Sequence, residues 1–230
     1  MKKLILSILT TLAVLPVLAA NKYDNPDTLF VSRDGTCEFR TIDEAIEVCR
    51  AFMDYTKVIY VKKGVYKEKL IIPSWLTHIT ICGEDRDQTI ITWDDHANIK
   101  MPTGGLDSEA AVKGKPIGTF RTYTLKVQGS YITLKNITIE NNAARLGQAV
   151  ALHTEGDHIL VQNCRLLGNQ DTVYTGVAGT RIRLLHRGDY RLHLRSFHRL
   201  VRELRNPQQV QQLYHSRVHT SRSAVWLRVP

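Results

Sequence analysis

Two segments of the chain, 27 residues apart, carry the same pattern of apolar and turn-forming residues. Residues 130–142 read SYITLKNITIENN and residues 157–169 read DHILVQNCRLLGN, so that Asn136 falls on Asn163. A period in the twenties, with short strands and an asparagine at a recurring turn, is typical of stacked β coils. In such a stack the side-chain amides of turn asparagines can form a ladder. The repeat therefore predicts an all-β solenoid. The alternative is a β sandwich in which the similarity is accidental.

Short β segments separated by turn residues surround this repeat. The expected strands are residues 58–61, 71–72, 79–82, 90–93, 123–127, 132–134, 137–140, 150–153, 159–161 and 165–167. No helical pattern intervenes between them, which disfavours a sheet built from βαβ units.

One segment of the body has a convincing helical pattern, and it begins after Thr41. Thr41 and Glu44 form a capping box, which satisfies two backbone donors at the start of a helix. The apolar residues at helical spacing that follow are Ile42, Ala45, Ile46, Cys49, Phe52 and Met53. Because the exposed end of a solenoid must be covered, we expect this apolar face to lie over the first coil.

The first 20 residues have the order of a secretory signal peptide. Lys2 and Lys3 precede an apolar run at residues 4–18, and the small residues Ala19 and Ala20 follow. The run is short and wrongly flanked for a membrane span. The alternative is a buried apolar strand. We expect cleavage after Ala19 or Ala20, and a secreted or periplasmic protein without a membrane anchor.

Four cysteines in an exported chain allow up to two disulfides. Cys37, Cys49, Cys82 and Cys164 are widely and irregularly spaced, with no CxxC motif and no paired histidines, which disfavours a zinc site. Cys49 lies on the apolar helix face, and Cys82 and Cys164 lie in apolar strands. Buried free thiols are therefore the favoured interpretation, and disulfides are the alternative. No metal ion and no cofactor are expected.

Amide and carboxylate side chains are the candidates for chemistry, because no GxSxG, HExxH or P-loop motif occurs. Gln148 interrupts the apolar stretch LGQAVAL, and Gln170 and Asp171 are adjacent in GNQDTVYT. Equivalent positions of neighbouring coils lie about 4.8 Å apart, so these three side chains can face one shallow groove. Glutamine amides can donate hydrogen bonds to a developing oxyanion. The alternative is that they are solvated or turn-forming residues at coil ends.

Over residues 30–181 the chain resembles the pectinesterases (pectin methylesterases), which fold as right-handed parallel β-helices. The motifs that carry the resemblance are SRDGTCEFRTIDEAI at 32–46, KKGVYKEKL at 62–70, GEDRDQTII at 83–91, GTFRTYTL at 118–125, QAVAL at 148–152 and GNQDTVYT at 168–175. The last two resemble the active-site signatures of that family. The lack of metal-ligand clusters also suits an esterase better than the calcium-dependent lyases that share the fold.

The resemblance implies hydrolysis of the C6 methyl esters of galacturonate units, which yields polygalacturonate and methanol in pectin catabolism and cell wall modification. By it, Asp171 is the general acid/base, Gln148 and Gln170 donate to the oxyanion, and Thr119, Phe120 and Gln148 contact the sugar. A second aspartate attacks the ester as nucleophile. Two neighbouring carboxyls raise the pKa of one of them, which keeps a proton available for acid catalysis. The expected partner is pectin, with the protein as a monomer.

The resemblance stops near Arg181. Residues 186–195 read HRGDYRLHLR, where the family has a DFIFG-like motif with the nucleophilic aspartate. With suitable third bases they can be encoded as CAT CGA GGG GAC TAC CGA CTT CAT CTT CGG. Read from the second base, this gives Ile-Glu-Gly-Thr-Thr-Asp-Phe-Ile-Phe, the missing motif. Residues 212–220, QLYHSRVHT, can give Ser-Tyr-Ile-Thr-Ala-Ala-Ser-Thr in the same register, which is again family-like.

Composition changes at the same point. Residues 181–230 hold 11 arginines, two acidic residues and no lysine, and they carry the whole formal net charge of +9. We therefore interpret residues 1–20 as a signal peptide, 21–181 as a partial pectinesterase domain and 182–230 as an out-of-frame basic tail.

This interpretation predicts a chain that is inactive as written. No aspartate then occupies the nucleophile position, because Asp189 belongs to the wrong register, and the family's later Arg-Pro-Trp motif is missing. The alternative function is a non-catalytic β-helical module whose basic tail binds acidic polysaccharide. A nucleic-acid-binding tail is disfavoured, because an exported protein rarely meets nucleic acid.

Two departures from the family bear on folding. Cys37 stands where the family loop usually has glycine, and it is strained if the backbone there requires a positive φ. A β-helix that ends near Arg181 leaves an open coil edge with unpaired strands, and we do not expect the tail to cover it.

Overall fold

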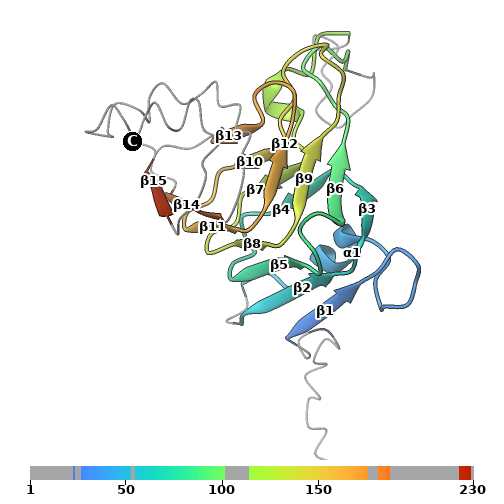
Figure 1. Ribbon diagram of the computed structural model, residues 1–230, viewed down its shortest axis with the longest axis vertical. Helices are drawn as coiled ribbons and strands as arrows, with labels where there is room; N and C mark the ends of the chain where they lie inside the picture. Colours follow the sequence, from blue (N-terminus) through green and yellow to red (C-terminus); the bar gives the residue numbers. More distant parts are fainter. Residues whose placement is uncertain are drawn as a thin grey trace, which may run out of the picture.

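The chain folds into stacked coils of short parallel strands. The computed structural model describes residues 23, 27–52, 55–101 and 114–175, together with the backbones of two strands at 181–186 and 223–228. The strands are β1 (Thr28–Val31), β2 (Lys57–Val61), β3 (Gly64–Lys67), β4 (Leu70–Ile72), β5 (Ile79–Gly83), β6 (Thr89–Trp93), β7 (Leu125–Val127), β8 (Thr133–Lys135), β9 (Thr138–Asn141), β10 (Leu152–Thr154), β11 (Ile159–Gln162), β12 (Arg165–Leu167), β13 (Val173–Thr175), β14 (Arg181–His186) and β15 (Ser223–Arg228). Figure 1 shows the stack running from β1 at one end to β15 at the other.

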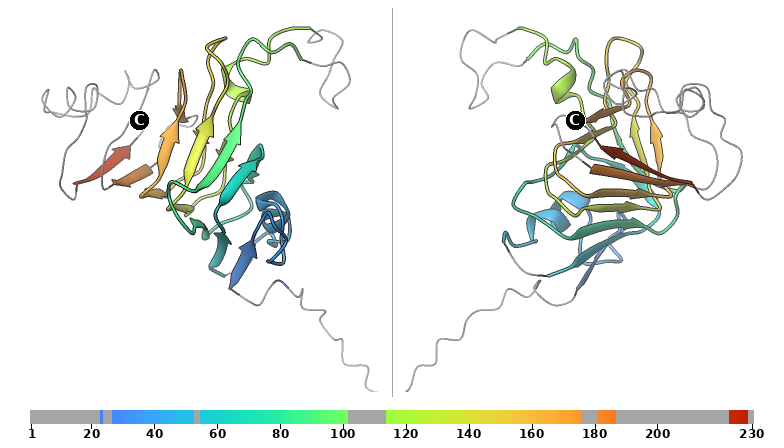
Figure 2. Two further views of the ribbon diagram at one scale, coloured as in Figure 1. Left: turned by 45° about the vertical axis from the view of Figure 1, so that its right-hand side comes forward. Right: turned by 90° about the vertical axis from the view of Figure 1, so that its left-hand side faces the viewer.

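Three sheets form the walls of this stack. Sheet A has the order β1-β2-β5-β8-β11-β14-β15, sheet B the order β12-β9-β6-β3, and sheet C the order β13-β10-β7-β4. Every pair is parallel except β14 with β15, which are antiparallel. The chain therefore passes through all three sheets in each complete coil, as the views in Figure 2 show. The predicted parallel β-helix is confirmed.

Alternation along each strand sends every second side chain into the space between the sheets. One column in sheet A shows this: Leu29, Ile59, Ile81, Leu134 and Val161 occupy equivalent places in five successive strands, and all are fully buried. Leu134 and Val161 are 27 residues apart, which is the predicted repeat. Burial of such aliphatic side chains stabilises the fold by about 1.5–3 kcal/mol each, relative to leaving them exposed.

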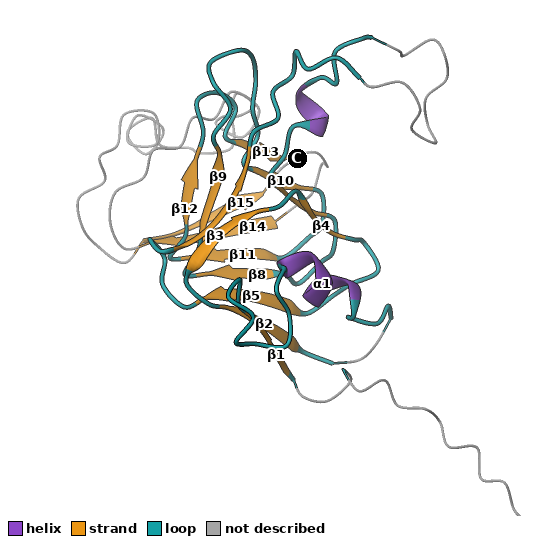
Figure 3. Cartoon of the chain, turned by 90° about the vertical axis from the view of Figure 1, so that its right-hand side faces the viewer, coloured by secondary structure: helices purple, strands orange, loops and turns teal. Residues whose placement is uncertain are grey.

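Helix α1 (Ile42–Glu47) covers the first coil, as predicted. The Thr41 hydroxyl accepts a hydrogen bond from the Glu44 N–H, and the Glu44 carboxylate accepts one from the Thr41 N–H, so the capping box is present. Ile42, Ala45 and Ile46 are buried in the core. Figure 3 shows α1 beside the strands at this end of the stack.

The helix is shorter than its apolar pattern predicted. It ends at Glu47, and Phe52, which we expected on the buried face, is 89% exposed. The reason lies in the turn that follows, where the Tyr55 hydroxyl accepts the Arg50 N–H and donates to the Arg50 carbonyl. The Tyr55 hydroxyl thus bonds both backbone groups of Arg50, whose backbone is not helical. Met53 lies outside the described residues.

The predicted strands correspond to β2 and to β4–β12, with shifts of one or two residues at most ends. Strands β1, β3 and β13 were not predicted. Nor were β14 and β15: β14 pairs with β11, and β15 pairs with β14, so backbone beyond Arg181 extends sheet A. The expectation that nothing in the basic tail would pair with the open edge is therefore wrong for these two strands.

All four cysteines are free, as the sequence favoured. Cys49 and Cys164 are buried, whereas Cys37 and Cys82 are only partly buried, and Cys164 lies in the turn after β11 rather than in a strand. Cys37 is not among the residues with positive φ, so the backbone strain considered for it does not arise.

Within the described ranges, no helix has the length and apolar character that crossing a membrane requires. The predicted signal peptide at residues 1–20 lies outside the described residues.

Candidate active site

The two stretches that contain the candidate catalytic residues lie on adjacent coils at sheet C. Gln148 precedes β10, and Gln170 and Asp171 precede β13, which pairs directly with β10. The Ala149 N–H donates a hydrogen bond of 3.0 Å to the Gln170 carbonyl oxygen, so the backbones of the two stretches are hydrogen-bonded. The fold thus brings together residues that are more than 20 positions apart in the sequence.

Asp171 has a left-handed backbone conformation, with φ of +57°. Aspartate tolerates this region better than most residues, but non-glycine residues adopt it rarely, and such conformations are concentrated at functional sites. At Gly168, in the turn before it, an added Cβ would lie 2.9 Å from Thr172 Oγ1 and 3.4 Å from the Ala149 carbonyl oxygen, so there is little room for a larger residue. Asp171 is partly exposed and its Oδ1 is buried, so the carboxyl group lies between the interior and the surface.

A buried amide that the sequence did not single out holds the segment after Gln148. The Asn141 side chain is 1% exposed, and its Nδ2 lies within hydrogen-bond distance of the carbonyl oxygens of Thr122 (2.8 Å), Asp95 (3.0 Å) and Val150 (3.1 Å). The Thr122 hydroxyl accepts the Val150 N–H at 3.0 Å. These contacts tie Asn141 to three other segments of chain and hold the backbone at Val150, two residues after Gln148.

Two of the three residues predicted to contact the sugar, Thr119 and Phe120, lie on a short 3₁₀ turn, η2 (Thr119–Arg121), beside sheet C. Gly118 precedes the turn with φ of +72°, a conformation that glycine adopts without a steric penalty. The Gly118 N–H also donates to the Ala97 carbonyl at 3.0 Å. Thr119 is partly buried, and the Phe120 side chain is 46% exposed.

Phe120 belongs to a cluster of four rings on the outer side of sheet C. The Phe120 centroid is 4.7 Å from that of His153 and 6.0 Å from that of Tyr174, with both pairs edge to face. The His153 centroid is 4.8 Å from that of Tyr174 and 6.0 Å from that of Tyr123. Tyr174 is three residues after Asp171, so the cluster lies next to the candidate acid/base.

Charged groups under this cluster are paired. Lys126 Nζ lies 3.0 Å from Glu155 Oε1 and 4.5 Å from the centroid of the Phe120 ring. Burial alone would raise the pKa of Glu155, but hydrogen bonds from Gln128 and Lys126 hold it below its ordinary value. Burial lowers the pKa of His153 to about 4, against the opposing effect of the Glu155 carboxylate, so the imidazole is neutral at neutral pH.

The arrangement suits hydrolysis at a sugar-bound ester. The exposed Phe120 ring can stack on a pyranose, the Gln148 and Gln170 amides can donate to an oxyanion, and the Asp171 carboxyl group can transfer a proton. Across the described part of the chain, no group of three His, Cys, Asp or Glu residues is placed to hold a metal ion. Asp189 lies outside the described residues.

Comparisons with known proteins agree with one another. The family model described as Pectinesterase matches residues 28–181. The chain is 34% identical over 145 residues to a probable pectinesterase/pectinesterase inhibitor of Arabidopsis thaliana, covering 63% of this chain and 23% of that protein. It matches the solved pectin methylesterase from carrot with a TM-score of 0.57 and 27% identity, over 67% of this chain and 43% of that one.

A third similar protein is a pectin methylesterase solved in complex with a hexasaccharide, with a TM-score of 0.55 and 26% identity, over 64% of this chain and 45% of that one. The chain spans about a quarter of the length of the first curated relatives it matches, and under half of these two solved structures.

Proposed function

Because this chain belongs to the pectinesterase family, a family of carboxylic ester hydrolases, we propose that its β-helix binds methyl-esterified homogalacturonan over the outer side of sheet C. The reaction of the complete site is hydrolysis of C6 methyl esters to carboxylates and methanol, in pectin catabolism or cell wall modification. The predicted signal peptide at residues 1–20 supports action outside the cytosol, in the periplasm or after secretion.

The observation that carries this proposal is the backbone hydrogen bond between Ala149 and Gln170. It joins the two stretches that contain Gln148 and Asp171, and the contact between Phe120 and Tyr174 brings the exposed aromatic ring to the same end of sheet C. The solved relative that contains a hexasaccharide supports an oligosaccharide as the ligand.

Each candidate residue has a distinct part in the proposed reaction. Asp171 protonates the departing methoxide and then takes a proton from the water that hydrolyses the acyl-enzyme. Gln148 and Gln170 donate hydrogen bonds to the oxyanion of each tetrahedral intermediate, and the loss of one such donor raises the barrier by about 2.7–4 kcal/mol. Thr119 and Phe120 contact the sugar. None of these steps calls for a cofactor.

A nucleophilic aspartate is the part that the chain as written does not supply. When the codons of residues 186–195 are read from the second base, they can encode an aspartate in a DFIFG-like context. In the written register, the bases of that aspartate codon are divided between the codons of Arg191 and Leu192. We therefore infer that the written chain retains the residues proposed to bind the sugar and lacks esterase activity. Resequencing the DNA around Arg181 tests this: one intact frame with unrelated codons at 186–195 would contradict it.

A binding experiment on the full chain separates this function from the alternative in which the basic tail binds acidic polysaccharide. Calorimetry measures the binding of two ligands, a fully methyl-esterified and a de-esterified galacturonate hexamer. Our proposal expects binding of the esterified hexamer that Phe120→Ala weakens and that Arg199→Gln with Arg202→Gln leaves unchanged. Binding confined to the de-esterified hexamer, and lost in the arginine variant or in salt, would support the alternative and overturn the proposal.

A further inference from the structure

One imidazole occupies the centre of the ring cluster on sheet C. His153 lies on β10 in register with Lys126 of β7 and Tyr174 of β13. Its ring contacts Phe120 at an interplanar angle of 79°, Tyr174 at 75° and Tyr123 at 67°. His153 is completely buried, whereas Phe120, which it supports, is 46% exposed.

Hydrogen bonding by its two ring nitrogens does not account for the buried position of His153. Nε2 lies 3.3 Å from Glu155 Oε1, and the backbone of Phe120 is near enough to raise the pKa of the imidazole, but neither nitrogen makes a hydrogen bond of good geometry among the described residues. A buried polar group without a good hydrogen bond costs free energy, and an apolar ring of similar size would avoid that cost. The His153 ring also contacts three aromatic neighbours, at geometries that favour aromatic pairs.

Besides His153, the neighbours of the Phe120 ring among the described residues are the Tyr174 ring, 6.0 Å away between centroids, and the Lys126 ammonium group. Phe120 lies on a turn of three residues, and the Lys126 ammonium group, which is paired with Glu155, approaches the ring at 4.5 Å. Edge-to-face contact with His153 at 4.7 Å restricts the tilt of the ring. The same imidazole restricts Tyr174 on the next coil, so one buried side chain sets the relative orientation of two rings.

We propose that His153 is a positioning residue, which holds Phe120 and Tyr174 at a fixed mutual angle so that they form a rigid platform for a pyranose ring. This inference rests on the proposed function, because the ligand of the platform is the esterified galacturonate chain. A platform that is rigid before binding loses less conformational entropy when the sugar stacks on it, which increases affinity.

A double-mutant cycle on the full chain tests the inference. The measured quantity is the Kd for fully methyl-esterified galacturonate hexamer, for wild type, Phe120→Ala, His153→Ala and the double variant. Loss of an edge-to-face contact corresponds to a change of about two- to tenfold, and we expect that weakening in His153→Ala. The double variant should lose less affinity than the sum of the two single losses, because part of the effect of His153 acts through the Phe120 ring that this variant lacks.

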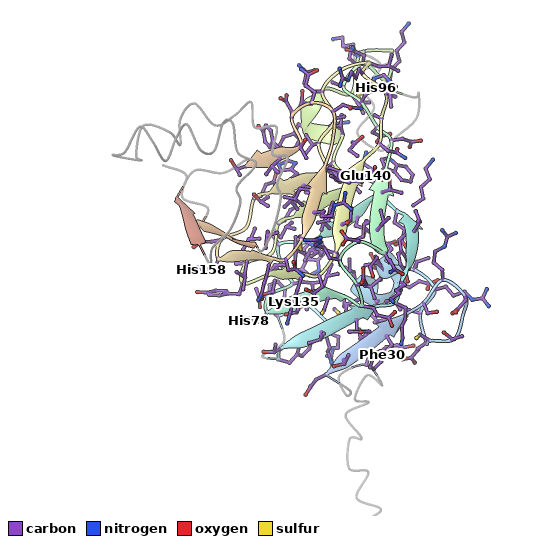
Figure 4. All side chains as sticks on the ribbon, viewed as in Figure 1. Phe30, His78, His96, Lys135, Glu140 and His158 are labelled. Atoms are coloured by element: carbon purple, nitrogen blue, oxygen red, sulfur yellow. The ribbon has the colours of Figure 1, made fainter. Side chains whose placement is uncertain are left out.

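Two further variants separate positioning from a general effect on the fold. His153→Phe retains an aromatic edge without the buried nitrogens, and it should restore the affinity to within about twofold of wild type. His158→Ala is the matched control: it removes an imidazole stacked on Tyr131 at 4.5 Å, next to sheet A and in view in Figure 4. We expect wild-type affinity in this control.

The failures of the two proposals are distinguishable. Wild-type affinity in Phe120→Ala would overturn the placement of the sugar, and the role of His153 with it. Weak binding by Phe120→Ala together with wild-type affinity in His153→Ala would overturn the positioning role alone. So would additive losses in the double variant, or a His153→Phe variant as weak as His153→Ala.

Discussion

The side-chain amide of Asn163 donates a hydrogen bond of 2.9 Å to Oδ1 of Asn136, which occupies the same turn one coil earlier. Both residues have left-handed backbones, with φ of +50° and +52°. Gly83 takes the equivalent place in the preceding coil, where an added Cβ would collide with the Asn136 carbonyl oxygen. The ladder therefore starts at Asn136, and it fixes the turn by which the chain leaves sheet A.

Replacement of Asn163 tests how much this ladder stabilises the fold. Asn163→Ala should lower the free energy of unfolding by about 2–3 kcal/mol, because it removes the hydrogen bond and places an alanine in the left-handed region. Asn163→Gly should cost less, since glycine accepts that backbone. Urea unfolding measures both, with the exposed Asn142→Ala as control. Equal losses in all three variants would contradict the role of the ladder.

The capping box of α1 gives a second stability prediction. Thr41→Ala removes the hydroxyl that accepts the Glu44 N–H, and it should lower the free energy of unfolding by about 1 kcal/mol. Ser74→Ala, at an exposed position, is the control and should change it by less than about 0.5 kcal/mol. A Thr41→Ala protein as stable as wild type would show that α1 is held by its buried face alone.

Stability should fall in acid because of His153. Its pKa is about 4 in the folded chain and about 6.5 when unfolded, so between these values the unfolded state binds a proton that the folded state does not. Acidification from pH 7 to pH 4.5 should therefore cost about 2–3 kcal/mol of stability through this residue. His153→Phe should lose that part of the pH dependence in urea titrations. An identical pH dependence in both proteins would show that His153 does not titrate in this way.

Alkylation distinguishes the cysteines by burial. Burial raises the pKa of Cys49 to about 11 and that of Cys164 to about 12, so neither forms much reactive thiolate near neutral pH. Treatment of the native chain with iodoacetamide at pH 8 should modify Cys37 first. Cys49 and Cys164 should react only after unfolding, as peptide mass spectrometry would show. Rapid modification of Cys164 in the native chain would contradict its buried position.

Much of the fold could be predicted because the repeat is local and regular. The spacing of Asn136 and Asn163 predicted both the coil period and the ladder, and Thr41 with Glu44 predicted the start of α1. The strands that were missed, β1, β3 and β13, have only three or four residues each. Such strands are defined by pairing with neighbouring coils rather than by a pattern of their own, and the end of α1 likewise depends on the contact between Tyr55 and Arg50.

From the sequence, the candidate site could be predicted only for residues that stand in recognisable motifs. Gln148, Gln170 and Asp171 stand in recognisable stretches, and the structure brings those stretches to adjacent coils. Asn141 and His153 were not identified, because their contacts come from residues distant in the sequence. The sequence around a single asparagine or histidine in a strand does not show which carbonyl groups or rings of other coils will contact it.

Methanol release from highly methyl-esterified pectin tests the central claim most directly. The assay compares the chain as written with the product of the same DNA after deletion of one nucleotide behind the Arg181 codon, and with Asp171→Asn in that product. We expect no release from the written chain, release from the restored chain, and loss of most of that release in Asp171→Asn. Release from the written chain, or full activity in the restored Asp171→Asn chain, would contradict the account.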